Sequence, residues 1–317
     1  MIVQFDCKNN KYVVISTYIF VISCVFFDKS LGVSHKSIIF APKKRNKYNL
    51  VLNTMNENKC KVALVCPTDD HTKEVMKRAT ENDVAEFVCF YGDDASVRAV
   101  ECVRSGGADV LMKGAVNTDV LLRAALDKEH GILQKGRVMT HVSVASIPGW
   151  ERPLIFSDAA VIPRPDIEQM DAIVRYTVEA ARNLDIPTPK VALINFTEKE
   201  NPKFPQTAVY QEIRRRAGEG RYGDMVIGGP MDVKTALDAE SGSIKGIASP
   251  VVGNADILIF PDIEAGNTFY KTITLFAHAT IAGWLAGTQV PVVVTSRADS
   301  VESKYYSLIT ALKMTTR

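Results

Sequence analysis

The sequence predicts an α/β protein with a mostly parallel sheet that helices cover on both faces. Short apolar runs alternate with amphipathic segments from Lys61 onward, an order typical of strand–helix–strand units. The chain has 317 residues, of which 46% are hydrophobic and 23% are charged. This composition is typical of a soluble globular protein, and the length suffices for one large or two ordinary domains.

The first half of the pattern contains three strand–helix pairs. Each predicted strand is a short apolar run, and each predicted helix carries apolar residues on one side. Gly106 and Gly107 close the second helix, and Thr118 is a candidate N-cap for the third. In chain order, these strands and helices alternate at 61–67, 71–83, 85–92, 95–107, 108–114 and 118–131.

Past Gly149 the pattern becomes less regular. Prolines interrupt the stretch 147–164, and this stretch and the glycines between Gly283 and Gly287 are candidate crossings between two lobes. The predicted helices lie at 166–184, 209–217 and 265–287, and the predicted strands at 190–196, 224–230, 255–262 and 291–297.

The first 54 residues do not follow this alternation. They contain the apolar run VVISTYIFVISCVFF at 13–27, which is shorter than the roughly 18–20 residues of a membrane-spanning helix. One interpretation is a signal peptide or a short anchor, although no small-residue cleavage site follows. The interpretation that we favour places the natural start at Met55, with 1–54 as upstream sequence translated in frame.

The charge balance and the cysteines are those of an ordinary cytosolic protein. A formal net charge of +2 provides no field that would attract nucleic acid, so individually placed residues must bind any anion. The six cysteines form no CxxC pair and have no histidine partner at zinc spacing. Scattered thiols fit a reducing compartment, so we expect a cytoplasmic protein whose folded body binds neither membrane nor nucleic acid.

Polar residues follow four of the predicted strands, at the position where ligands collect in open α/β sheets. Taken alone, each of them is equally well explained as a solvated strand end, a turn or a helix cap. Together, the cations, hydroxyls and glycine joints suit an anion with several oxygens, such as phosphate. The residues are Lys113, Asn117, Thr118 and Arg123 after one strand, Gly228 and Gly229 after the second, Asp262, Glu264 and Asn267 after the third, and Ser296, Arg297 and Asp299 after the last.

Sequence motifs of several other protein classes are missing. The chain has no GxxxxGK[ST] phosphate loop, no GxGxxG after a strand and no GxSxG elbow. These absences weaken the nucleoside triphosphate and dinucleotide hypotheses. The five histidines are dispersed, and His141, which lies in an apolar run, is best explained as a packed core residue.

Five sequence blocks carry a family resemblance. They are LMKGAVNTDVLLRAALDKEHGI, RVMTHVSV, NPKFPQT, ADILIFPDIEAGNTFYKT and PVVVTSRADSVESK. In this order they resemble the phosphate acetyl/butyryltransferase family, and more closely its phosphate butyryltransferase branch. The resemblance extends from Lys61 to the C-terminus.

The resemblance implies a two-lobed isocitrate/isopropylmalate dehydrogenase-like fold whose second lobe is inserted into the first. Residues 55–142 and 287–317 would form the first lobe, residues 143–286 the second, and the active site would lie between them. The family is typically dimeric through the inserted lobe. The implied reaction is reversible acyl transfer between coenzyme A and inorganic phosphate, both as substrates, and it requires no metal or bound cofactor.

The resemblance also assigns roles to individual residues. Ser296 would donate a hydrogen bond to the developing oxyanion, and Arg297 would bind phosphate with its planar fork. Arg123 matches a second family arginine, which contacts phosphate or coenzyme A. The remaining predicted substrate-binding residues are Lys113, Asn117, Thr118, Glu264, Asn267 and Asp299.

Two features depart from the family pattern. The family's acetyltransferases carry an aspartate, proposed as the base toward the thiol, at the position of Ser303 in this chain. Glu302 is therefore our candidate base, with Asp299 or a coenzyme A that arrives as thiolate as alternatives. The segment 92–99 is also shorter than in relatives, which place another strand there and, in the acetyltransferases, another arginine.

Three alternative functions follow from these observations. The first is a preference for acetyl over butyryl groups. The second is an acyl-CoA-binding relative without turnover, which the short segment 92–99 motivates. The third is a metal- and nicotinamide-dependent dehydrogenase on the same fold, which needs clustered aspartates, whereas Asp224 and Asp262 are isolated in the sequence.

Overall fold

The computed structural model describes residues 59–199, 201, 203–295 and 299–315, and the backbone of four strands between residues 2 and 39. Contacts divide the chain into two units, Met1–Asn49 and Leu50–Arg317. All of the predicted site residues belong to the second unit.

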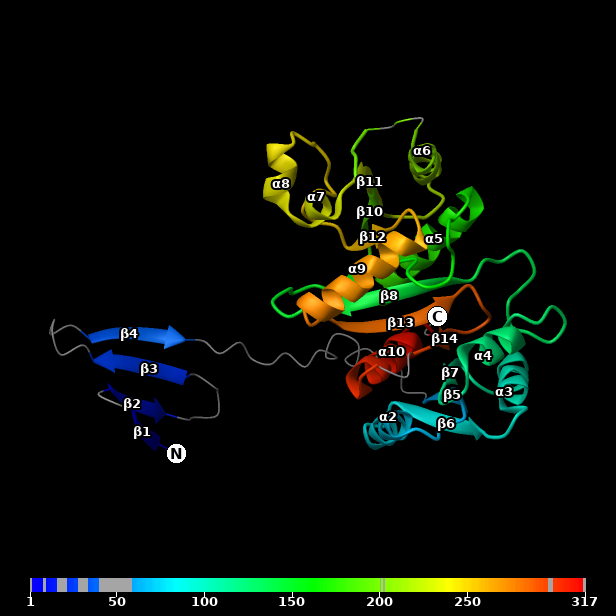
Figure 1. Cartoon of the computed structure of the whole chain (residues 1–317), viewed down its shortest axis with the longest axis horizontal. Helices are drawn as coiled ribbons and strands as arrows, with labels where there is room; N and C mark the ends of the chain where they lie inside the picture. Colours follow the sequence, from blue (N-terminus) through cyan, green and yellow to red (C-terminus); the bar gives the residue numbers. More distant parts are fainter. Residues whose placement is uncertain are drawn as a thin grey trace. The chain divides into compact units, whose positions relative to one another are not determined.

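The first unit contains two antiparallel hairpins (Figure 1). They consist of β1 (Ile2–Cys7) with β2 (Asn10–Ile15), and of β3 (Ile22–Phe27) with β4 (Ser34–Ile39). The apolar run 13–27 therefore contributes to β2 and β3, and its middle, 16–21, lies outside the described residues. None of the helices described combines the length and apolar character needed to cross a membrane. The interpretation of 1–54 as upstream sequence stays a prediction.

The second unit contains a ten-stranded sheet with two parallel flanks, so the predicted mostly parallel sheet is confirmed. The strand order is β11-β10-β12-β9-β8-β13-β14-β7-β5-β6. The central strands β8 and β13 are antiparallel to each other and to their outer neighbours, β9 and β14. In chain order the strands are β5 (Cys60–Val65), β6 (Ala85–Phe90), β7 (Val110–Lys113), β8 (Thr140–Ser146), β9 (Leu154–Ser157), β10 (Lys190–Ile194), β11 (Val226–Met231), β12 (Ile257–Ile259), β13 (Thr280–Ala286) and β14 (Val292–Val293).

Helices occupy most of the connections between these strands (Figure 1). They are α2 (Asp70–Glu81), α3 (Ala95–Arg104), α4 (Thr118–Ala125), α5 (Ile167–Asn183), α6 (Gln206–Gly218), α7 (Val233–Leu237), α8 (Ala239–Ile244), α9 (Ile263–Phe276) and α10 (Val301–Lys313). α10 packs against α2 and the central strand β13, whereas α3 packs against α4 and β5. β6 forms one edge of the sheet, and α3 begins shortly after it, at Ala95, within the short segment 92–99.

The single long helix predicted at 265–287 is wrong, because this stretch forms α9 and then β13. α9 ends at Phe276, with Ala277 as its C-cap, and His278 turns the chain with a positive φ of 50°. All seven residues of β13 pair with β8. The apolar residues of 280–286 fit a helical period as well as a strand, so only the neighbouring β8 decides between the two.

Smaller differences also separate the predicted and observed elements. The strand predicted to end at Gly228–Gly229 continues through both glycines as β11. Gly229 has a φ of +116°, and a Cβ there would lie 2.5 Å from the Leu193 carbonyl oxygen, so no other residue fits this approach. In the second unit, five described elements, β8, β9, α7, α8 and α10, have no counterpart among the elements predicted from the sequence.

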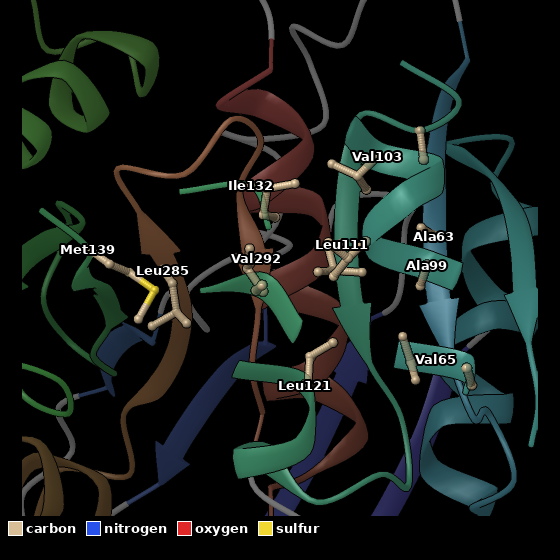
Figure 2. Packing of buried hydrophobic residues seen from close by; sticks show 14 residues of the cluster. Ala63, Val65, Ala99, Val103, Leu111, Leu121, Ile132, Met139, Leu285 and Val292 are labelled. Carbon is tan, nitrogen blue, oxygen red and sulfur yellow. The ribbon is translucent and has the colours of Figure 1, made fainter. Parts of the chain in front are cut away.

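Two hydrophobic clusters lie under the two flanks of the sheet. In the first, shown in Figure 2, Leu111 of β7 and Val292 of β14 pack with Val103 of α3 and Leu121 of α4. The second gathers residues of β9, β12 and α9, including Phe156, which contacts Phe269 edge to face at 5.3 Å. β14, from the segment predicted to return to the first lobe, pairs with β7 of that lobe. The lobe bounds themselves stay a prediction.

Candidate active site

Three helices begin at the carboxyl ends of neighbouring parallel strands. β5 leads to α2, β7 leads to α4 and β14 leads toward α10, and these three strands are adjacent and parallel in the sheet. The free N–H groups and the partial positive charge of a helix start favour anions. This edge therefore offers the environment that a phosphate needs.

The ends of β5 and β7 approach each other unusually closely. A Cβ on Gly114 would lie 2.4 Å from the Cys66 carbonyl oxygen and 2.5 Å from that of Val65, which only glycine avoids. The amides of Gly114 and Ala115 donate to these two carbonyls at 2.8 Å each. The loop that follows Lys113 is thus held against the end of β5.

Lys113 is buried at the end of β7, with 3% of its surface exposed. Its Nζ donates to the carbonyl oxygens of Gly114 and Val116, at 3.1 Å each. The side chain therefore folds back onto its own loop and stabilises it. Its predicted role in substrate binding stays a prediction.

The other predicted residues of this loop lie on α4. Asn117, and not Thr118, is the N-cap, since Thr118 already has helical backbone geometry. The prediction of Thr118 as the cap is therefore wrong by one residue. Arg123 lies exposed in the last turn of α4, with no ion-pair partner among the residues that the structure describes.

A partly buried ion pair joins the starts of α2 and α10. Asp69 caps α2 by accepting the amide hydrogen of Thr72 at 2.9 Å, and it also accepts from Lys304 Nζ of α10 at 3.3 Å. Burial alone would raise the pKa of Asp69, but the hydrogen bonds from Thr72 and the charge of Lys304 outweigh it and lower the pKa. Ser300 caps α10 through the amide of Ser303 at 3.2 Å. The two helix starts are therefore held side by side.

Ser296 and Arg297 lie outside the described residues, between the end of β14 and the start of α10. Their predicted roles are thus not tested. The described neighbours Thr295 and Asp299 bound this gap, and Thr295 is buried.

The two candidate bases, Glu302 and Asp299, face different surroundings. Glu302 Oε1 lies 3.8 Å from Nη1 of Arg78 on α2, in a half-exposed pair. The Asp299 charge instead acts on His141 of β8 and Tyr270 of α9. The Asp299 charge is thus felt by groups of β8 and α9, and its carbonyl oxygen lies 3.2 Å from Nδ1 of His71 on α2, the helix that Glu302 also contacts.

Burial is the main cause of the pKa shifts of Tyr270 and His141. It raises the pKa of Tyr270 to about 12, and the Asp299 carboxylate adds to this rise. Burial also lowers the pKa of His141, although the charges of Asp158 and Asp299 oppose this effect. The imidazole is therefore neutral at neutral pH, and its Nδ1 lies 3.2 Å from Ser143 Oγ. The prediction that His141 is buried is confirmed.

The start of α9 carries the last two predicted residues. Glu264 is exposed in the first turn, which Asp262 caps by accepting the amide hydrogen of Ala265 at 2.8 Å. Asn267 Nδ2 donates to the Ala159 carbonyl at 3.0 Å. Asn267 is therefore a loop contact in this structure, and ligand roles for both residues stay predictions.

The sequence reasoning missed Asp158, which follows β9 and lies beside the start of β8. Its side chain is buried, with 2% of the residue exposed. An aspartate between Ser157 and two alanines looks like an ordinary turn residue, and only the pairing of β9 with β8 brings it next to His141.

Known proteins resemble this chain over most of its length. Residues 34–312 match the family described as phosphate acetyl/butaryl transferase. The chain is 35% identical over 277 residues to a phosphate acetyltransferase of Thermotoga maritima, covering 87% of this chain and 94% of the relative. It is also 35% identical over 284 residues to a phosphate butyryltransferase of Clostridium beijerinckii, covering 81% of this chain and 93% of the relative.

Solved structures show the same fold. A branched-chain phosphotransacylase from Enterococcus faecalis is 29% identical and has a TM-score of 0.72, over 81% of this chain and 99% of that chain. A phosphotransacetylase from Streptococcus pyogenes has a TM-score of 0.75 at 21% identity, over 86% of this chain and 99% of that chain. The predicted two-lobed class of fold is thereby confirmed.

Proposed function

The chain belongs to the phosphate acetyl/butyryltransferase family, and we propose that it transfers an acyl group reversibly between coenzyme A and inorganic phosphate, with butyryl or a similar short chain preferred. The family match over residues 34–312 carries the reaction class. Relatives named for acetyl and for butyryl transfer are equally similar, at 35% identity, so the butyryl preference rests on the sequence blocks alone.

The arrangement of the helix starts supports this chemistry. A phosphate oxygen attacks the thioester carbonyl, a C–O bond forms, the C–S bond breaks, and the coenzyme A thiolate leaves. The starts of α2, α4 and α10 favour the phosphate charge. Arg297 would hold the phosphate, and Ser296 would donate to the oxyanion. Positioning of the two substrates supplies much of the rate.

The reverse reaction needs the thiol of coenzyme A to lose its proton. The two candidate bases are Glu302, which lies beside Arg78, and Asp299, whose charge acts on His141 and Tyr270. We propose Glu302 or Asp299 as the base. Phosphate and acyl-CoA are substrates in this scheme, and the protein acts as a cytoplasmic homodimer.

The test is phosphate-dependent release of free thiol from acetyl- to hexanoyl-CoA by the full chain. We expect the highest kcat/KM with butyryl-CoA and loss of nearly all activity in Arg297→Ala. Arg137→Ala is the control, because Arg137 is an exposed arginine that lines a pocket with Asp109 and Pro291, the residues that precede β7 and β14 at the opposite ends of these strands. No thiol release above background with any of these substrates would refute the proposed function and favour an acyl-CoA-binding relative without turnover.

A further inference from the structure

We propose that Asp158 is a positioning residue for this acyl transfer: its buried carboxylate ties the start of β8 to the loop that supports the start of α9. The kinetic part of this inference rests on the proposed function. The structural part does not, because it concerns contacts between described residues.

The Asp158 carboxylate accepts hydrogen bonds from both of the segments that it would join. Two of the donors, a hydroxyl and a backbone amide, belong to the start of β8. The other three are successive backbone amides of the loop. The contacts are Thr140 Oγ1 at 2.8 Å, His141 N at 3.1 Å and Ile162 N at 3.3 Å to Oδ2, and Ala160 N at 2.8 Å and Val161 N at 3.0 Å to Oδ1.

The same loop supports α9 at three points. Asn267 Nδ2 donates to the Ala159 carbonyl at 3.0 Å, and the Ile263 amide donates to the Pro163 carbonyl at 3.0 Å. A Cβ on Gly266 would lie 2.1 Å from the Asp158 carbonyl oxygen, so the helix backbone rests directly on the loop. The position of the first turns of α9 therefore depends on the loop that Asp158 holds.

The elements that Asp158 joins carry two groups that respond to the charge of Asp299. β8 carries His141 and α9 carries Tyr270, and the Asp299 charge acts on both. A shift of the loop would move α9 relative to β8, and with it two groups that interact with Asp299, one of the two candidate bases. Misplacement of a reacting group by about 1 Å can cost about a hundredfold in rate.

The chemistry of the donors makes this carboxylate poorly replaceable. All five contacts are neutral N–H or O–H donors, and none of the described lysines or arginines forms an ion pair with Asp158. In Asp158→Asn, the amide NH₂ would replace one acceptor and face donors at either position. The variant keeps the shape of the side chain but breaks at least two of the contacts.

The experiment compares Asp158→Asn with Asp171→Asn in the full chain. Asp171 is a matched control, because it is also buried, at 3% exposure, but joins α5 to α6 through Arg216, Arg221 and Tyr222. We expect both variants to lower Tm. At a temperature where both are folded, we expect kcat to fall about tenfold to a hundredfold in Asp158→Asn, with KM changed less, and to stay at the wild-type value in Asp171→Asn.

Hydrogen exchange tests the structural part without any activity. We expect faster exchange at the amides of Ala160, Val161, Ile162 and Ile263 in Asp158→Asn, and no change there in Asp171→Asn. Wild-type kcat together with unchanged exchange at these amides would overturn the inference while the proposed function stands. If the wild type transfers no acyl group, the proposed function and the kinetic part of the inference fail together, and the exchange result decides the structural part alone.

A second variant keeps the inference testable if Asp158→Asn does not fold. Thr140→Val removes one donor to the carboxylate and keeps the shape of the buried side chain. We expect the same change in kcat and exchange in smaller measure. Full activity and unchanged exchange in Thr140→Val would count against the inference.

Discussion

Two buried carboxylates of this protein, Asp158 and Asp171, are stabilised in opposite ways. Asp158 accepts only from a hydroxyl and backbone amides, whereas Asp171 accepts from the guanidinium groups of Arg216 and Arg221 and from Tyr222 Oη, the latter at 2.9 Å. Asp171 connects α5 with α6 and the turn that follows it, far along the chain from the predicted site residues.

The difference indicates what each carboxylate does. A buried charge that pairs with cations replaces part of its hydration by Coulomb attraction, and removing one partner leaves the others uncompensated. A buried charge that neutral amides hold contributes little through charge pairing, but it fixes the direction of every donor. Asp171 therefore acts mainly on stability, and Asp158 mainly on geometry.

The largest expected effect comes from removing the ion-paired carboxylate altogether. Asp171→Ala leaves Arg216 and Arg221 without their buried partner, so we expect unfolding free energy to fall by about 3–5 kcal/mol. Urea denaturation checks this. A loss below about 1 kcal/mol would show that Glu168 and Glu212, which also pair with Arg216, compensate fully.

Each of the two carboxylates accepts a hydrogen bond from one hydroxyl group, which allows a finer test. Thr140→Val and Tyr222→Phe each remove one hydroxyl donor to a buried carboxylate, at 2.8 and 2.9 Å. Hydrogen bonds to charged groups contribute about 1.5–3 kcal/mol, so we expect similar losses of stability in both. Only Thr140→Val should also lower kcat, and an equal kinetic effect of Tyr222→Phe would remove the distinction between the two sites.

The pH dependence of stability separates the ion-paired carboxylate further. Burial raises the pKa of Asp171, but hydrogen bonds from Arg221, Tyr222 and Arg216 outweigh it, so the folded-state pKa lies below the usual value. The contribution of Asp171 is therefore complete above the unfolded pKa of about 3.9 and is lost as pH falls through the folded pKa. We expect the stability difference between wild type and Asp171→Asn to shrink below about pH 4. A constant difference across an acid titration would contradict this.

The smallest effect should come from an exposed carboxylate. Glu81 and Lys77 form a pair on α2 at 3.9 Å, with more than half of each side chain exposed. Such pairs contribute about 0.3–0.5 kcal/mol, so Glu81→Gln should change unfolding free energy by no more than that. At high salt the change in unfolding free energy caused by Glu81→Gln should be smaller still, whereas that caused by Asp171→Ala should persist.

The parallel flanks of the sheet could be predicted from the sequence because their signals are local. The strands near Val62, Leu111 and Leu258 are apolar runs between glycines, polar loops and amphipathic helices, and each was placed within a few residues of its observed position. The central strands could not be predicted in the same way. β13 was assigned to a helix, because Ile281, Trp284 and Leu285 fit both periods until β8 lies beside them.

The candidate site divides in the same manner. Lys113 ends β7, Asn117 precedes α4, and Asp299 lies between β14 and α10, so their place at the carboxyl edge could be read from the chain order. Glu302 lies beside Arg78 of α2, and Asn267 contacts a loop. Both contacts depend on how helices pack against segments that are distant in the chain.

The sequence by itself therefore determined the family, the alternation of strands and helices, and the loops that carry the chemistry, because each is written in contiguous residues. The tertiary structure alone decided that β8 and β13 form the centre of the sheet and that Asp158 lies between β8 and the loop under α9. Both depend on pairing between residues far apart in the chain, such as Thr140 with Ala286, and no local pattern encodes such partners.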